Sequence, residues 1–380
     1  MIILVNASNL KVGGGLQVAD SICRELHKYP HHHFVVVLPP ALEGCAADIQ
    51  QERNVEVVRY ALPRSLRTVL TGRQHFLDHL VRERGVQAVL TVFGPSLWQP
   101  RCLHVCGFAR PHLVLPDSPF FRSGGPKRRW RLALRRWQLR LAFGLGAGIY
   151  YTENSFISVR LKQLYPGKRV YTVTNNCNQV FHQPAAWRRD IQLPPFEGLT
   201  LLTISANYPH KNLRILPAAA DALQQQEPGL RFRFVLTIGE EELGVLTPAQ
   251  RSHFVCLGRV DISQCPPLYE QADIMLLPSL LECFSASYAE AMQMGVPIVT
   301  TDLGFAHSLC ADAALYYDPC SPEALARAIG RLAREPELRS RLAEAGRRQL
   351  LRFDTFEERS RKLINIIEHE YQRYATATPL

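Results

Sequence analysis

Short apolar runs rich in β-branched residues alternate with stretches of helical periodicity along most of this chain. The runs are IILV at 2–5, FVVVL at 34–38, VEVVRY at 55–60, AVLTVF at 88–93, GIYYT at 148–152 and VYTVT at 170–174, then LTLLTIS at 199–205, FRFVLTI at 232–238, HFVCLG at 253–258, DIMLLPS at 273–279, PIVTTD at 297–302 and ALYYDP at 314–319. Strands that alternate with helices predict parallel sheets joined by right-handed crossovers. Twelve strands exceed one comfortable sheet. The sequence therefore predicts two doubly wound α/β domains, each with six strands.

The boundary between the two domains is predicted within residues 175–198, which are rich in Pro and Asn and have no clear period. We predict a first domain over 1–178, completed by a C-terminal helix over 355–380, and a second domain over 179–354. In the second domain, Ser321 is predicted to cap a helix that begins at Pro322. Ligands of open parallel sheets bind beyond the carboxyl ends of the strands. Two such domains facing each other would hold a ligand in the cleft between them.

Composition and cysteine spacing exclude several classes of protein. Hydrophobic residues make up 47% and charged residues 21% of the 380-residue chain, as in soluble globular proteins. No apolar run is long enough to span a bilayer, and the first ten residues do not resemble a signal peptide, so we expect a cytoplasmic protein. The ten cysteines include no C-x-x-C pair, which favours reduced thiols over a zinc site.

Two strand-to-helix loops carry residues suited to phosphate. Gly14 and Gly15 follow the first strand in NLKVGGGLQVAD, where glycine lets backbone amides approach a phosphate at a helix N-terminus. This loop is neither G-x-G-x-x-G nor a Walker loop, so a nicotinamide or ATP site is not supported, and a flexible turn is the alternative. Lys211 follows the first strand of the second domain, beside Asn207, and a cation there can neutralise a diphosphate. A surface lysine is the alternative interpretation.

A third loop lies in PSLLECFSASYAEAMQMGVPIVTTD, residues 278–302, and holds two carboxylates. Glu282 is predicted at the carboxyl end of a strand, and Glu290 two turns into the helix that follows, on roughly the same side. Carboxylates at these positions can accept hydroxyl groups, and the amides of Phe284, Ser285 and Ala286 at the helix start can bind phosphate oxygens. Two solvated surface glutamates are the alternative.

The same stretch resembles the E-x7-E signature of the retaining glycosyltransferases of family 4, which have the GT-B fold. Further matches are GGGLQVA near the start, YYTENSFISVRLKQLY at 150–165, ANYPHKNL at 206–213 and LGRVDISQCPPLYEQADIMLLPS at 257–279. Several motifs in the right order make this resemblance more specific than any one of them.

The resemblance implies a role for each matching residue. Glu282 would contact the donor sugar, Glu290 would hold the ribose hydroxyls, and Lys211 would bind the diphosphate. The remaining donor contacts would come from Gly14, Gly15, Asn207, Val260, Phe284, Ser285 and Ala286. The implied reaction transfers a sugar from a nucleotide diphosphate with retention at the anomeric carbon, without a cofactor or a metal.

The sequence departs from the family pattern at two points. Many relatives carry an arginine six residues before the lysine, where this chain has Ser205, and E-G-F-G is here E-C-F-S. The family also leads us to expect a histidine at the end of a first-domain strand near the sugar, and His104 and His112 both remain candidates.

A basic stretch, PKRRWRLALRRWQLRLAFGLG at 126–146, places Trp130, Leu134, Trp137 and Leu141 at helical spacing. One interpretation is an interfacial membrane helix in which Trp130, Trp137, Arg131 and Arg135 contact anionic lipid. The other is an ordinary helix with its tryptophans in the core and its arginines in solvent.

The leading functional hypothesis is a glycosyltransferase of cell-surface polysaccharide or glycolipid synthesis, with a nucleotide-diphosphate sugar as donor and a glycan or lipid-linked acceptor. We expect it at the inner face of the cell membrane. Alternatives are a GT-B sugar-nucleotide epimerase, a phosphorylase, which would need a Schiff-base lysine, and a basic nucleic-acid binder. A nucleic-acid binder would have basic residues interleaved with aromatic ones across a sheet, whereas the basic residues of this chain are concentrated on one predicted helix.

Overall fold

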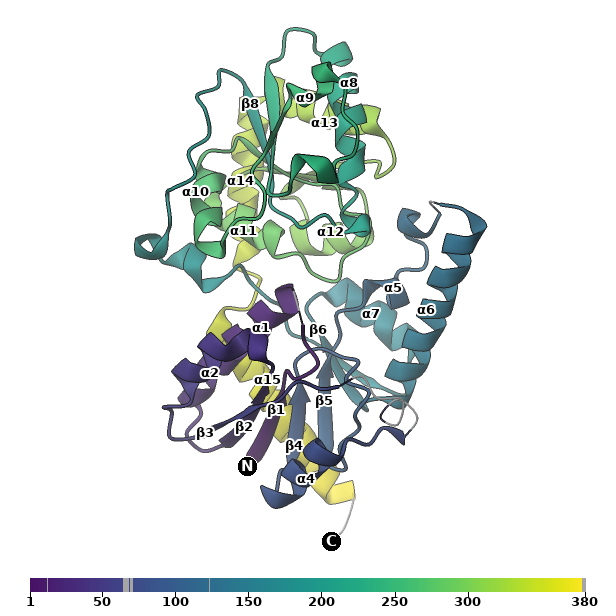
Figure 1. The fold of residues 1–380 in the computed structure, drawn as a ribbon, viewed down its shortest axis with the longest axis vertical. Coiled ribbons are helices and arrows are strands. Elements are labelled where there is room, and N and C mark those ends of the chain that lie inside the picture. The colour runs from purple at the N-terminus through teal and green to yellow at the C-terminus, as the bar shows by residue number, and fades with distance from the viewer. Residues whose placement is uncertain (12, 64–67, 69–70, 123, 378–380) are drawn as a thin grey trace. The chain divides into compact units, whose positions relative to one another are not determined.

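The computed structural model describes residues 1–11, 13–63, 68, 71–122 and 124–377. The chain forms two units of α/β structure (Figure 1). The first domain comprises residues 1–114, 126–175 and 354–380, and the second comprises 115–125 and 176–353. The segment 115–125 thus belongs to the second domain although first-domain residues flank it. Residues 378–380 of the predicted C-terminal helix lie outside the described residues.

The first domain contains a parallel sheet of seven strands in the order β3-β2-β1-β4-β5-β6-β7. Their bounds are β1 Ile2–Asn6, β2 His33–Leu38, β3 Val55–Arg59, β4 Ala88–Thr91, β5 Leu103–Gly107, β6 Ile149–Thr152 and β7 Arg169–Thr172. The helices of this domain whose bounds fall among the described residues are α1 Gly14–Glu25, α2 Glu43–Ile49, α4 His75–Glu83, α5 Pro111–Val114, α6 Pro126–Leu145, α7 Ser155–Leu164 and α15 Phe356–Ala377.

Helices cover both faces of this sheet because successive strand residues point to opposite sides. Ile3 and Val5 of β1 pack with α1, α2 and α15, and Leu4 packs with α4 on the other face. Both faces of the inner strands are therefore buried, as the continuous apolar runs in the sequence require.

The prediction of six strands for this domain is wrong, because β5 was missed. Its sequence, LHVCG, is short and carries a histidine in place of an apolar residue. The ring of His104 is hydrogen-bonded to Thr91 Oγ1 at 2.9 Å. Burial lowers the pKa of His104 to about 4, so the imidazole is neutral and fits within the sheet.

The second domain repeats the same plan with six parallel strands, in the order β10-β9-β8-β11-β12-β13. Their bounds are β8 Leu199–Thr203, β9 Phe232–Leu236, β10 Phe254–Cys256, β11 Ile274–Leu277, β12 Ile298–Thr301 and β13 Ala314–Tyr317. The α-helices are α8 Leu216–Gln226, α9 Pro248–Arg251, α10 Cys265–Glu270, α11 Ala286–Met294, α12 Gly304–Cys310, α13 Pro322–Arg334 and α14 Pro336–Leu350. The predicted fold class, two doubly wound α/β domains, is confirmed.

The start of α13 is the predicted one. Ser321 Oγ accepts a hydrogen bond from the backbone N–H of Ala324 at 3.0 Å, and Pro322 occupies the first helical position. Among the described helices, none combines the length and the apolar character needed to cross a bilayer.

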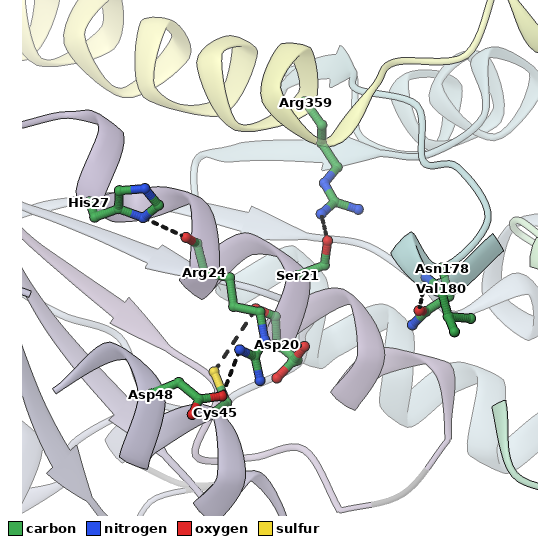
Figure 2. A network of polar contacts seen from close by, with 9 residues as sticks. All are labelled: Asp20, Ser21, Arg24, His27, Cys45, Asp48, Asn178, Val180 and Arg359. Atoms are coloured by element: carbon green, nitrogen blue, oxygen red, sulfur yellow. Dashed lines mark hydrogen bonds and ion pairs between the residues drawn. The ribbon is translucent and has the colours of Figure 1, made fainter. Parts of the chain in front are cut away.

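The C-terminal helix α15 is fixed to the first domain by a buried arginine. The guanidinium group of Arg359, 2% exposed, donates hydrogen bonds to Ser21 Oγ of α1 at 2.7 Å and to Asn175 Oδ1 at 2.5 Å. Figure 2 shows Arg359 extending from α15 to Ser21. Burial lowers the pKa of Arg359, while the nearby carboxyl of Glu153 acts in the opposite direction. The cation is therefore retained by its polar partners.

We predict that Arg359→Ala destabilises the first domain. The substitution removes both hydrogen bonds and the cation nearest the buried Glu153. Breaking such a buried network costs about 3–5 kcal/mol. Urea unfolding should detect this loss, whereas Arg361→Ala, at an exposed position of the same helix, should change stability by less than about 0.5 kcal/mol. A loss below about 1 kcal/mol for Arg359→Ala would show that the network does not hold the helix in place.

Candidate functional site

The second domain has its topological switch point at β8, which pairs with β9 on one side and β11 on the other. Crossovers leave this strand pair in opposite directions along the sheet, so the loops after β8 and β11 open beside each other at the carboxyl edge. The first loop carries Lys211 and the second carries Glu282.

Lys211 and Glu282 form a largely buried ion pair, with 2.6 Å between Nζ and Oε1. Their side chains are 13% and 9% exposed. A backbone hydrogen bond joins the two loops next to the pair, from Leu280 N–H to the carbonyl oxygen of His210 at 2.8 Å. This hydrogen bond holds the two loops together next to the ion pair. Within the pair, each charge offsets part of the desolvation cost of the other.

Glu290 lies on α11 and is buried beside this pair. Tyr269 of α10 donates a hydrogen bond from its hydroxyl to Glu290 Oε2 at 3.0 Å. Burial raises the pKa of Glu290 to about 7, against the opposing effects of the Tyr269 hydroxyl and the Lys211 cation. Lys211 therefore acts on both predicted carboxylates, through an ion pair with Glu282 and through its effect on the pKa of Glu290. We refer to Lys211, Glu282 and Glu290 as the charged cluster.

The N-terminus of α11 adds backbone donors near the cluster. Ser285, at the N-cap, makes no side-chain capping hydrogen bond. Within the described part of the chain, no protein group accepts a hydrogen bond from the amides of Phe284, Ser285 or Ala286. The ring of Phe284 packs edge-on against Phe353. These amides and the helix dipole favour an anion at this end of α11.

Residues 118–120 also contact the loops that carry Lys211 and Glu282. Ser118, 6% exposed, donates a hydrogen bond from Oγ to the carbonyl oxygen of Leu280 at 2.5 Å. Phe120 lies edge-on to the ring of His210, with 6.5 Å between the centroids. Leu280 is thus fixed at both its N–H and its carbonyl, two residues before Glu282.

An open hollow of about 740 Å³ lies in the second domain, between residues 119–122 and the carboxyl ends of β12 and β13. Asn212, next to Lys211, reaches its rim through a hydrogen bond to the carbonyl oxygen of Pro319 at 3.4 Å. The hollow is lined by Pro119, Arg122, Asp302, Asp318, Pro319 and Cys320.

The other predicted second-domain residues lie in loops that follow strands of the same sheet. Asn207 donates from its side-chain amide to the carbonyl oxygen of Glu242 at 2.7 Å. The N–H of Ser205 donates to Thr237 Oγ1 at 3.0 Å. Because the serine side chain is neutral, this position contributes no cation beside Lys211. Val260 is half-buried in the loop after β10. None of the three contacts the charged cluster through a hydrogen bond among those found in the described residues.

The predicted first-domain residues belong to a separate part of the chain. Gly13 takes φ +81° before α1, a conformation that favours glycine, and Gly14 and Gly15 begin the helix. His112 lies in α5, just after the carboxyl end of β5, whereas His104 lies inside β5. Their roles toward a ligand remain predictions.

Sequence reasoning missed Tyr269 and Ser118. Tyr269 occurs in LYEQADI, a segment that resembled the family, but nothing in the sequence links it to a glutamate 21 positions later. Ser118 lies in a stretch assigned to the other domain. Among the described residues, no group of three or more His, Cys, Asp or Glu side chains could hold a metal ion.

Comparison with known proteins gives matches in both sequence and fold. Residues 198–335 match the family model described as glycosyl transferases group 1. A curated relative, the D-inositol 3-phosphate glycosyltransferase of Salinispora arenicola, is 26% identical over 208 residues, which cover 51% of this chain and 46% of the relative. The chain spans about half the length of the curated relatives it matches.

Solved structures share the fold over nearly the whole chain. The sucrose-phosphate synthase of Thermosynechococcus elongatus superposes with a TM-score of 0.67 at 15% identity, covering 99% of both chains. HepE of Anabaena, solved in complex with UDP and glucose, gives a TM-score of 0.62 at 16% identity, covering 97% of this chain and 99% of HepE. Identities this low establish a common architecture and nothing finer.

We predict that Lys211 and Glu282 are energetically coupled. Lys211→Met alone should lower the free energy of unfolding by about 3 kcal/mol, because it leaves a buried carboxylate without its cation. In a double-mutant cycle with Glu282→Gln, the coupling energy should reach about 1 kcal/mol or more. The exposed pair Glu344–Arg348, tested with Glu344→Gln and Arg348→Met, should give about 0.5 kcal/mol or less. Equal coupling for the two pairs would contradict the buried geometry.

Proposed function

The chain belongs, through its second domain, to the group 1 glycosyltransferases of the GT-B fold, and we propose that it transfers a sugar from a nucleotide-diphosphate donor with retention at the anomeric carbon. The observation that supports this proposal most strongly is the cluster of Lys211, Glu282 and Glu290 at the switch point of the second domain. It combines one cation with two carboxylates, the groups that a sugar diphosphate nucleotide requires.

Each part of the donor has a suitable partner in the cluster. The diphosphate would bind Lys211 and the free amides at the start of α11, which offset the charge that develops on the leaving group. Glu282 would accept hydroxyls of the sugar, and Glu290, held by Tyr269, would accept the ribose hydroxyls.

The proposed reaction proceeds on one face of the sugar. The bond between the anomeric carbon and the β-phosphate oxygen breaks, and the acceptor hydroxyl attacks from the same side. The proton of the acceptor hydroxyl passes to the departing phosphate oxygen, so the reaction needs no protein base. Lys211 and the α11 amides stabilise the diphosphate product, and we propose that the reaction uses no cofactor or metal.

We propose that the acceptor is a glycan or a lipid-linked molecule of cell-surface polysaccharide or glycolipid synthesis, met at the cytoplasmic face of the membrane. Val260 would border the nucleotide base, and Asn207 would lie near the diphosphate. In the first domain, Gly14 and Gly15 would offer amides to phosphate, and His112 is the histidine whose place after a strand suits the sugar.

A thermal-shift screen against UDP-, GDP-, ADP- and dTDP-sugars, without added metal, tests the donor site. One nucleotide class should stabilise the protein selectively, by an amount that grows with ligand concentration. The shift should disappear in Glu290→Ala and in Lys211→Ala, and persist in Glu337→Ala, which alters an exposed carboxylate of α14.

Stabilisation that survives both cluster variants would place the nucleotide elsewhere and contradict the proposal. Conversion of the bound sugar nucleotide into an isomer in the absence of any acceptor would instead indicate an epimerase.

A further inference from the structure

Helix α6 of the first domain exposes a continuous apolar stripe. Its side chains recur at i, i+4, i+7, i+11 and i+15, the spacing of one helix face. Trp130 is 66% exposed and Trp137 58%. The full stripe consists of Trp130, Leu134, Trp137, Leu141 and Leu145, all exposed. At 1.5 Å per residue it is about 22 Å long.

The opposite face of α6 attaches the helix to its domain. Phe143 is buried and packs edge-on against Phe108, with 4.8 Å between ring centroids. The Tyr150 and Tyr165 hydroxyls donate hydrogen bonds to the carbonyl oxygens of Phe143 and Arg140. The interpretation that placed Trp130 and Trp137 in the core is therefore wrong, because the inward positions are taken by other residues.

Basic side chains border the stripe on both sides. At 100° per residue, Arg129 and Arg140 lie along one edge, and Lys127 and Arg131 lie along the other. All four are exposed, as is Arg135. The sequence contains no acidic residue between Asp117 and Glu153. Apolar side chains flanked by cations, in a stretch of sequence without acidic residues, form a surface complementary to anionic lipid headgroups over an acyl layer.

We propose that this face of α6 is an interfacial docking surface for an anionic lipid bilayer. The two tryptophans would enter the headgroup boundary, and Lys127, Arg129, Arg131 and Arg140 would contact lipid phosphates. A second copy of this chain is a poor occupant, because two such faces would bring like charges together. The inference does not depend on the proposed reaction, since it rests on exposure and charge alone.

Vesicle flotation of the 380-residue chain tests the proposal. Binding should be strong to vesicles of phosphatidylcholine with 30 mol% phosphatidylglycerol and at least about ten-fold weaker to phosphatidylcholine alone. It should weaken at high salt, because salt screens exposed charges. Brominated lipid should quench tryptophan fluorescence of the bound protein, which reports insertion and not charge attraction alone.

Two sets of variants separate the apolar and the basic contributions. Trp130→Ser with Trp137→Ser should abolish vesicle binding, whereas Val245→Ser with Leu351→Ser, which alters two exposed apolar residues of the second domain, should not change it. Arg129→Gln, Arg131→Gln and Arg140→Gln combined should weaken binding by roughly 100-fold.

The charge-matched control is Arg53→Gln, Arg341→Gln and Arg352→Gln, at exposed positions elsewhere. This control variant should bind anionic vesicles with nearly the same affinity as the unaltered protein.

Three results would overturn the proposal: equal binding to neutral and anionic vesicles, vesicle binding that survives loss of both tryptophans, or a dimer in light scattering that the tryptophan variant disperses. Thermal unfolding of the variants should stay within about 2 °C of the unaltered protein, because the altered side chains are exposed. Donor-induced thermal shifts should also persist in the tryptophan variant, so failure of membrane docking is distinguishable from failure of the donor site.

Discussion

The parallel pairing of β8 with β11 is the constraint on which the candidate site depends. Leu201 and Leu202 of β8 lie opposite Ile274 and Met275 of β11. This register brings two loops far apart in sequence to the same edge of the sheet. The backbone hydrogen bond between Leu280 and His210 then fixes their spacing, and the ion pair between Lys211 and Glu282 follows from it.

The candidate site contains carboxyl groups whose charged form is disfavoured by burial. Glu282 and Glu290 are both buried, and burial raises the pKa of Glu290 to about 7. A raised carboxyl pKa means that the folded state binds a proton more tightly than the unfolded chain. Its contribution to stability is present below the unfolded pKa near 4.5 and is lost as pH rises toward 7. Such destabilised groups are frequent at functional sites, where a ligand supplies the missing partners.

Much of this arrangement could be predicted from sequence, because spacing encodes it. Strand and helix periods predicted two doubly wound domains, and the offset between Glu282 and Glu290 predicted that both lie on roughly the same side. The rest depends on tertiary contacts. Tyr269 reaches Glu290 only because α10 packs beside α11, and β5 has too weak a pattern for detection. For α6, the spacing of Trp130 and Trp137 suits a buried or an exposed face equally, and only packing of Phe143 on the opposite side decides between them.

We propose that Glu290 binds the ribose of a nucleotide, and isothermal titration calorimetry tests this contact. At pH 8, where the Glu290 carboxyl is largely ionised, one would titrate the nucleoside diphosphate of the stabilising donor class and its 2′,3′-dideoxy analogue. The unaltered protein should prefer the ribonucleotide by about ten-fold or more, as expected for hydrogen bonds to a charged group, and Glu290→Gln should lose most of that preference. An equal preference for the ribonucleotide in both proteins would show that Glu290 does not bind the ribose.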